Sequence, residues 1–496
     1  MKPVLCAACG TVLSYYCLFP LYRSGTISVN GLLALAFIPV VFLSLLRVLS
    51  SFHESRLLRL MTFWTITFAT GLAIGIAAGI NISDTVRFGI PENTIQGISG
   101  TLLDDPRVVS GGRAMSTLSL KMAMGDGGTR ATSHGQITVF FREENSQRLK
   151  EFGRGTEVFA EGKLRNTGAG GATFSGVTFS ADALHITKTA STLERFRTGL
   201  RLGLTDRFIN SSNGGAWAGL ALALLLGIRD NLDTGFAALY RDAGCSYILA
   251  LSGMHLAIIV SLISFLLKKP LGLRLAAIAG ALIIIAYCFI VGPLPSLNRA
   301  ALMYLLGVVA VLGMLKRDML SLLCMAFLIQ LVLAPASGFS LSFILSYLAL
   351  AGILVIGKAI NNAFLGKIPV FMLQPLSASV GAFLATAGVS AWFFNDLRPI
   401  GILAGLILAP LATVFMVLSI AWLALGSIFP ALSFLLGKFL FLLYWLMEKT
   451  ASLAAAVPGI KTNSFLVLSL SLIMTAAILW LDWRRRIIAG RLEPFA

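Results

Sequence analysis

The sequence predicts a polytopic α-helical membrane protein into which a small β-rich domain is inserted. Hydrophobic residues make up 57% of the 496 residues and charged residues only 12%, about half of the roughly 25% that soluble domains carry. Apolar runs of about 20 residues, the length that crosses a bilayer, recur along the chain. One long polar segment interrupts them. These observations exclude a soluble globular protein.

Three apolar runs precede the polar segment, at residues 4–22, 32–49 and 60–80. The predicted N-terminal membrane domain therefore covers residues 1–82 and holds about three helices. The linker between the second and third runs is richer in arginine than the first linker. The positive-inside rule places it in the cytoplasm, so the third helix exits outward. Gly71, Gly75 and Gly79 in that helix predict a ridge for close helix packing.

Residues 83–190 are predicted to form an extracytoplasmic β-rich domain. Short alternating stretches separated by Gly, Asp and Asn turns predict five strands, at residues 94–103, 116–124, 136–141, 157–164 and 172–186. Five short strands suit a small β-barrel, and the OB-fold is one such barrel that often binds nucleic acid. The domain also holds aromatic residues that either pack in its core or stack on bases: Phe140, Phe141, Phe159, Phe174 and Phe179.

Residues 191–213 are predicted to form an amphipathic helix at the membrane interface. Leu193, Phe196, Leu200, Leu204 and Phe208 recur at helical spacing with arginines between them, a pattern typical of helices on a membrane surface. A collar that gathers phosphates remains an alternative for the same helix.

The rest of the chain, residues 214–496, contains about nine or ten further apolar runs. Lys and Arg exceed Asp and Glu by 17 in the whole chain, but residues 83–195 hold thirteen basic and twelve acidic residues. About 16 of the excess positive charges therefore lie in the membrane part and the termini. Positive-inside bias explains most of them, and a phosphate-attracting path is the alternative for the remainder.

The segment 227–259 is the most unusual part of this membrane domain. Charged side chains there adjoin apolar runs, and a charge at mid-bilayer costs roughly 3 kcal/mol or more unless it faces a cavity or a partner. Small and polar residues follow inside an apolar run, where glycine allows a helix to break and serine satisfies a freed carbonyl. The segment is either the polar lining of a pore or a solvated junction between helices.

Several blocks in serial order carry a family resemblance. CSYILALSGMHL at 245–256 follows LALLLGIRDNL at 222–232, and SLNRA at 296–300 and GFSLSF at 338–343 come after it. This order resembles the ComEC-type competence protein family of DNA uptake channels. The resemblance implies that residues 214–496 form a multi-helix channel domain in the bacterial inner membrane. Its implied function is to pass single-stranded DNA into the cytoplasm during natural transformation, with no enzymatic activity and no cofactor.

A polyanion such as DNA needs compensating cations along its route. Together with this requirement, the resemblance gives an expected DNA path. Arginines would contact phosphates, aspartates would hold those arginines in place, and small polar residues would shape the constriction. The expected path residues are Arg229, Asp230, Arg241, Asp242, Ser252, Gly253, His255 and Arg299.

The sequence also departs from the family. Tyr247 stands where the family usually has His, and Ser340 where it has Gln, which puts any role of these two positions in doubt. Many members append a metallo-β-lactamase-like domain, but no His-x-His-x-Asp-His cluster is present and the chain ends at Ala496. We therefore expect a separate nuclease. We also expect a helicase-like cytoplasmic motor, because no phosphate-binding Gly-x-x-x-x-Gly-Lys loop is present, and a DNA receptor at the surface.

Two other functions stay open at this point. A secondary transporter for a small solute would use His255 and Asp230 as a proton relay, although no inverted repeat is visible. An intramembrane enzyme would use Ser252 and His255, which lie three positions apart and share a helix face.

Overall fold

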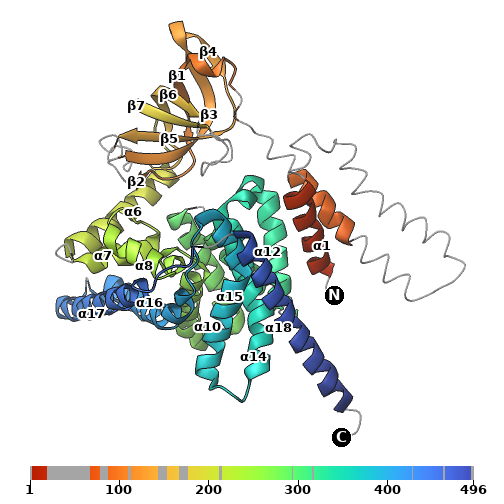
Figure 1. Ribbon diagram of the computed structural model, residues 1–496. Helices are drawn as coiled ribbons and strands as arrows, with labels where there is room; N and C mark the ends of the chain where they lie inside the picture. Colours follow the sequence, from red (N-terminus) through yellow and green to blue (C-terminus); the bar gives the residue numbers. More distant parts are fainter. Residues whose placement is uncertain are drawn as a thin grey trace, which may run out of the picture. The chain divides into compact units, whose positions relative to one another are not determined.

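The computed structural model describes residues 3–18, 67–78, 86, 88–109, 113–142, 153–166, 177–211, 215–292, 294–315, 318–426, 428–461 and 464–492. The chain forms two compact units. One unit consists of Met1–Ile76, Ser212–Ile285 and Leu294–Ala496, and is helical in its described part. The other, Ala77–Ser211 with Ala286–Pro293, holds the β strands (Figure 1).

The helical unit begins with α1 (Pro3–Val12) and its π-helical continuation η1 (Leu13–Leu18). The helix Thr67–Ala78 packs against them. A Cβ atom on Gly71 would overlap the Ala7 carbonyl oxygen, and one on Gly75 would overlap the Ser14 hydroxyl. The predicted glycine ridge is therefore confirmed at these two positions, whereas Gly79 and the predicted run 32–49 lie outside the described residues.

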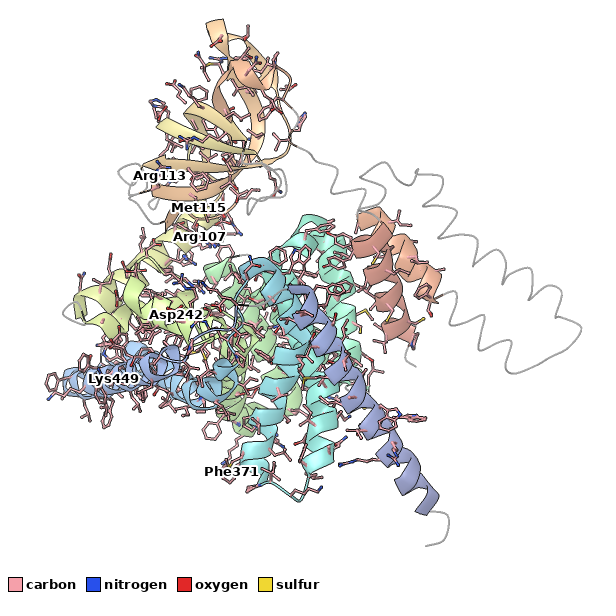
Figure 2. All side chains as sticks on the ribbon, viewed as in Figure 1. Arg107, Arg113, Met115, Asp242, Phe371 and Lys449 are labelled. Atoms are coloured by element: carbon pink, nitrogen blue, oxygen red, sulfur yellow. The ribbon has the colours of Figure 1, made fainter. Side chains whose placement is uncertain are left out.

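Seven helices in the described part of the chain are long and apolar enough to cross a membrane. Their number, length and composition are those of a multi-pass membrane protein. Many of their large apolar side chains are exposed, such as Phe371 at 77% (Figure 2), as expected for helices that face lipid. The spans are Gly272–Val291 in α10 (Gly253–Val291), α11 (Pro295–Leu312), α13 to α14 (Leu341–Gly352, then the π-helical Ile353–Gly357, then Lys358–Phe364), α15 (Val370–Phe394), α16 (Ile400–Leu425), α17 (Pro430–Ala455) and α18 (Ser464–Leu492).

Shorter helices precede or separate these spans. They are α7 (Ala216–Leu226), α8 (Thr234–Asp242), α9 (Ser246–Leu249) and α12 (Met319–Leu333). The apolar run at residues 246–267 does not form one helix, because the chain leaves α9 at the extended residue Ala250 (ψ 129°) and restarts as α10 at Gly253. The chain turns again at Gly272 (φ 73°), two residues after Pro270. Proline lacks the N–H that continues a helix, and glycine tolerates a positive φ.

The β-rich unit contains one seven-stranded mixed sheet. β1 pairs with β3 and β6, β6 with β7, β7 in parallel with β5, and β5 with β3, so the pairings return to β1. β2 and β4 each pair with β3. The strands are β1 (Ile95–Leu102), β2 (Arg107–Val109), β3 (Arg113–Gly125), β4 (Arg130–Thr132), β5 (Gln136–Arg142), β6 (Glu157–Asn166) and β7 (Val177–Lys188).

The five longer strands agree with the five predicted ones. β2 and β4 were not predicted because three residues are too few to show an alternating pattern. Ile98, Leu118, Val139 and Phe179 form part of the hydrophobic core between the strands, each at most 1% exposed. The predicted helix after the strands is α6 (Thr192–Ser211), which belongs to the same unit.

Candidate functional site

The break between α9 and α10 is held by Ser252 and His255. The Ser252 hydroxyl accepts a hydrogen bond from the Met254 N–H (3.3 Å), and His255 Nδ1 accepts one from the Ser252 N–H (3.1 Å). These contacts satisfy N–H groups that the first turn of a helix leaves without partners. Because Nδ1 is an acceptor, a neutral ring carries its proton on Nε2. His255 is 1% exposed, and its Nε2 has no hydrogen-bond partner among the described residues.

Arg299 on α11 is a buried cation at 7% exposure. Its Nη1 donates to the Ser346 carbonyl oxygen, and its guanidinium carbon lies 5.8 Å from the centre of the Tyr347 ring. Its Nε has no hydrogen-bond partner, and no carboxylate among the described residues forms an ion pair with it. A buried charge without a counter-ion is costly, so Arg299 is suited to receive an anion.

Gly253 links the helix break to this arginine. A Cβ atom on Gly253 would lie 3.3 Å from Arg299 Nη2 and 3.3 Å from Ala300 Cβ. The absence of a side chain therefore brings the first turn of α10 against the guanidinium. Ser252, Gly253, His255 and Arg299 of the predicted set are thus gathered at one place in the helical unit.

Three further polar residues that the sequence reasoning did not select surround this place. Ser296 Oγ donates to the Leu251 carbonyl oxygen (2.7 Å), Tyr347 Oη donates to Gln330 Oε1 (2.8 Å), and Gln330 Nε2 donates to the Pro295 carbonyl oxygen (3.2 Å). These bonds tie α11, α12 and α13 together. Gln330 interrupts an apolar helix, and a search for uncharged polar residues inside apolar runs would have found it. The polar cluster consists of Ser252, His255, Ser296, Arg299, Gln330 and Tyr347, of which Ser252 and Ser296 are half-buried and the others buried.

The other four predicted path residues lie on exposed segments. Arg229 and Asp230 follow α7, and the Arg229 Nη2 donates to the Leu249 carbonyl oxygen (2.9 Å) at the end of α9. Arg241 and Asp242 end α8, where Arg241 Nε lies 3.5 Å from Asp242 Oδ1 and the Arg241 side chain is 74% exposed. These residues are accessible to a solvated polyanion.

Arg398, which the sequence reasoning missed, also binds Asp242. Its Nη1 donates to the Asp242 carbonyl oxygen (2.7 Å), its Nη2 lies 3.6 Å from the Asp242 carboxylate, and its Nε donates to Asp396 (2.8 Å). Asp242 is therefore shared between Arg241 and Arg398. This pairing joins the end of α8 to the loop that precedes α16.

The two positions that depart from the family pattern have local contacts. Ser340 caps α13, because its hydroxyl accepts a hydrogen bond from the Phe343 N–H (3.3 Å). Tyr247 is 52% exposed, and its hydroxyl fills the space beside Gly405. The cap gives Ser340 a structural role.

The described residues of the β strands offer exposed arginines rather than exposed aromatic rings. Arg107 on β2 and Arg113 on β3 are exposed at the same hairpin (Figure 2). Phe141 and Phe179 lie in the core at 2% and 0% exposure, and Phe140 and Phe159 are half-buried. Phe174 lies outside the described residues.

α6 differs from a simple amphipathic helix in which of its residues are buried. Leu193, Phe196 and Leu200 are 63%, 67% and 37% exposed, whereas Arg197 is 1% exposed. The exposed leucines and phenylalanine form one stripe along the helix, on positions that share a face. Arg197 points to other residues of its own unit. It is therefore not a free cation of a phosphate collar.

Within the described residues, no group of three or more His, Cys, Asp and Glu side chains comes together.

Comparisons with known proteins give one family match. A family model described as competence protein matches residues 224–486, which is more than half of the chain. An uncharacterized protein of Aquifex aeolicus (strain VF5) is 28% identical over 193 residues, which cover 39% of this chain and 44% of that protein. The chain thus aligns with less than half of that relative. No solved structure matches.

Proposed function

Since the chain belongs to the competence protein family, whose name implies DNA uptake in natural transformation, we propose that it passes single-stranded DNA across the bacterial inner membrane. The family match covers the helix break, Arg299 and the last membrane helices. The transported strand carries one phosphate charge per nucleotide, so its route needs cations that are not already neutralised.

The observation that carries this proposal is the uncompensated charge of Arg299. Its guanidinium is 7% exposed, carries a free Nε, and is paired with a carbonyl and a ring rather than a carboxylate. On α10, His255 offers a second donor, Nε2, that has no hydrogen-bond partner among the described residues. A passing phosphate diester would supply the acceptor oxygens that both side chains lack.

A contact between the strand and these two side chains requires the helices to move. His255 and Arg299 are too buried to touch a strand in the arrangement described, so α10 and α11 must separate from α13 when DNA passes. The exposed Arg229 and Arg241 would attract the strand before that step, and Asp230 and Asp242 would limit how far these arginines swing. Ser252 and Gly253 would line the constriction itself.

The β-rich unit is proposed to be an OB-like barrel outside the membrane. Support comes from the strand pairings, which lead from β1 through β3, β5, β7 and β6 back to β1. Arg107 and Arg113 would contact the incoming strand. The apolar stripe of α6 would lie in the interface of the lipid bilayer, which explains why Leu193 and Phe196 are exposed.

Transport through such a route needs other proteins. We propose a surface DNA receptor that delivers DNA, a separate nuclease that removes the second strand, and a helicase-like motor in the cytoplasm that pulls.

Transformation with labelled DNA tests the proposal. Deleting the gene should abolish the arrival of label in the cytoplasm while leaving DNA capture at the cell surface intact, and the variants Arg229→Gln and Arg241→Gln should do the same. Unchanged arrival in the deletion strain would refute the channel function. If the deletion strain lost uptake of a small solute and kept uptake of DNA, a secondary transporter would be favoured.

A further inference from the structure

Five charged residues of the β-rich unit form a connected ionic network around Asp105, which lies between β1 and β2. Arg197 on α6 donates to both carboxylate oxygens of Asp105, with Nη1 3.1 Å from Oδ1. Arg201, one helical turn later, brings its Nε to 3.7 Å from Asp105 Oδ2. Arg197 Nη1 also lies 3.1 Å from Glu194 Oε2. We call Asp105, Arg154, Glu194, Arg197 and Arg201 the ionic clamp.

The loop before β6 closes around the same carboxylate. The Arg154 N–H donates to Asp105 Oδ1 (3.1 Å), and the Arg154 side chain donates to Glu194 Oε1 (3.0 Å). Gly153, at φ 61°, has no room for a side chain, because a Cβ atom there would overlap the Thr198 hydroxyl and lie 3.1 Å from Asp105 Oδ1. Backbone and side chains of the loop thus hold Asp105 and α6 together.

The clamp also reaches the end of helix Gly272–Val291. Arg197 Nε donates to the Phe289 carbonyl oxygen (2.9 Å), and Arg201 Nη1 donates to the carbonyl oxygens of Ile290 (2.9 Å) and Val291 (2.7 Å). Carbonyls of a last helical turn have no partners inside the helix and carry partial negative charge. Two arginines of α6 supply the missing donors.

The buried charges of the ionic clamp are stable only while they remain paired. Arg197 is 1% exposed, and removing one partner of a buried ion pair leaves a charge that is strongly destabilising. Burial alone would raise the pKa of Asp105, but the Arg197 hydrogen bond and the charges of Arg201 and Arg197 lower that pKa below its usual 3.8. The carboxylate therefore stays ionised at every physiological pH.

We propose that the ionic clamp is a positioning device, in which Asp105, Arg197 and Arg201 fix the β sheet to the last turn of a membrane-spanning helix. The role in transport rests on the proposed function. A strand bound to the β sheet is then held at a fixed place relative to the end of that helix. Arg197 and Arg201 serve here through their contacts with protein atoms and do not touch DNA.

Hydrogen–deuterium exchange of the full-length protein in lipid nanodiscs tests the clamp directly. In Asp105→Asn, the amides of residues 192–201 and 286–292 should exchange at least tenfold faster, while those of β1, β6 and β7 keep the parent rates. The matched control is Glu157→Gln, which removes a carboxylate of the same domain from an exposed ion pair, 2.8 Å from Lys121 Nζ. This control should leave the exchange of both segments unchanged.

In cells, Asp105→Asn should capture DNA at the surface as the parent does and deliver at least fivefold less of it to the cytoplasm. Unchanged exchange in the two segments overturns the clamp, and unchanged delivery despite faster exchange overturns its positioning role.

A milder variant covers the case in which Asp105→Asn also loosens the strands. Arg201→Met leaves the Asp105–Arg197 pair in place and should speed exchange at 286–292 alone, whereas parent rates there overturn the clamp. The exchange experiment needs no transport activity. A gene deletion that leaves DNA delivery unchanged would thus refute the proposed function while the exchange rates still decide on the clamp.

Discussion

The substitution Arg299→Met separates the two effects of the buried guanidinium, one on stability and one on transport. Methionine keeps an unbranched apolar chain of similar reach and removes the charge. The folded protein loses the hydrogen bond to the Ser346 carbonyl oxygen and the contact with the Tyr347 ring. It also sheds the desolvation cost of an unpaired buried ion, which amounts to several kcal/mol. Thermal stability should therefore stay the same or rise.

Transport should respond in the opposite direction. A hydrogen bond to a charged group contributes about 1.5–3 kcal/mol, and about 1.4 kcal/mol corresponds to a factor of ten. Losing one such contact between Arg299 and a phosphate should therefore lower DNA delivery by about 10- to 150-fold. Cytoplasmic arrival of labelled single strands measures this effect, and thermal unfolding of the purified protein in detergent measures stability.

Arg484→Met is the matched control. Arg484 also lies over an aromatic ring, with its guanidinium carbon 5.5 Å from the centre of the Trp480 ring, but it is exposed. Its loss should leave delivery within about twofold of the parent, since exposed interactions contribute little. A variant Arg299→Met that is less stable yet transports normally would refute the reasoning, because the arginine would then serve the fold and not the strand.

Three further predictions follow from the described contacts. Gly253→Val should reduce DNA delivery at least tenfold without reducing surface capture, because its side chain would press on the Arg299 guanidinium; normal delivery in this variant would contradict the proposed constriction. Gly71→Leu should lower the stability of the N-terminal helix pair by about 1–3 kcal/mol, seen as a lower melting temperature, whereas Gly199→Ala, with open space around it, should not. Asp105 has a lowered pKa, so its contribution to stability is complete above about pH 5 and is lost as the pH falls through the folded-state pKa. Lowering the pH to 3 should therefore reduce the thermal stability of the parent more than that of Asp105→Asn, and equal losses of stability would contradict the assignment.

The helices and longer strands could be predicted because their causes are local. A bilayer fixes the length of a spanning helix. The positions of α11, α13, α15 and α16 follow from apolar runs, each of which ends at polar residues or glycine. The same holds for the five longer strands, where alternation marks the buried face. The break at Ala250 was missed because the apolar run continues across it, and the break depends on hydrogen bonds of Ser252 and His255.

The contacts of the charged residues could not be predicted, because they depend on partners far away in sequence. In α6, arginines between apolar residues suggested a solvated charged face. The structure buries Arg197 instead, because the guanidinium binds Asp105 and the Phe289 carbonyl oxygen. Each partner lies 92 residues away in sequence, one on either side of Arg197. Similarly, Arg299 was selected for its charge, but its partners on α13 follow only from the packing of α11 against that helix.

The geometry around Ser252 bears on whether the Ser–His pair does chemistry. Ser252 Oγ and His255 Nδ1 lie 3.1 Å apart, a distance at which a histidine base could activate a serine nucleophile. Here, however, Nδ1 has a single lone pair and already accepts from the Ser252 N–H, and the hydroxyl accepts from the Met254 N–H. Both atoms are engaged in starting α10, and Nε2, the nitrogen left over, faces no acidic orienting group among the described residues. The pair therefore works as a helix cap, and under the proposed function the remaining Nε2–H of His255 would be a donor for a phosphate.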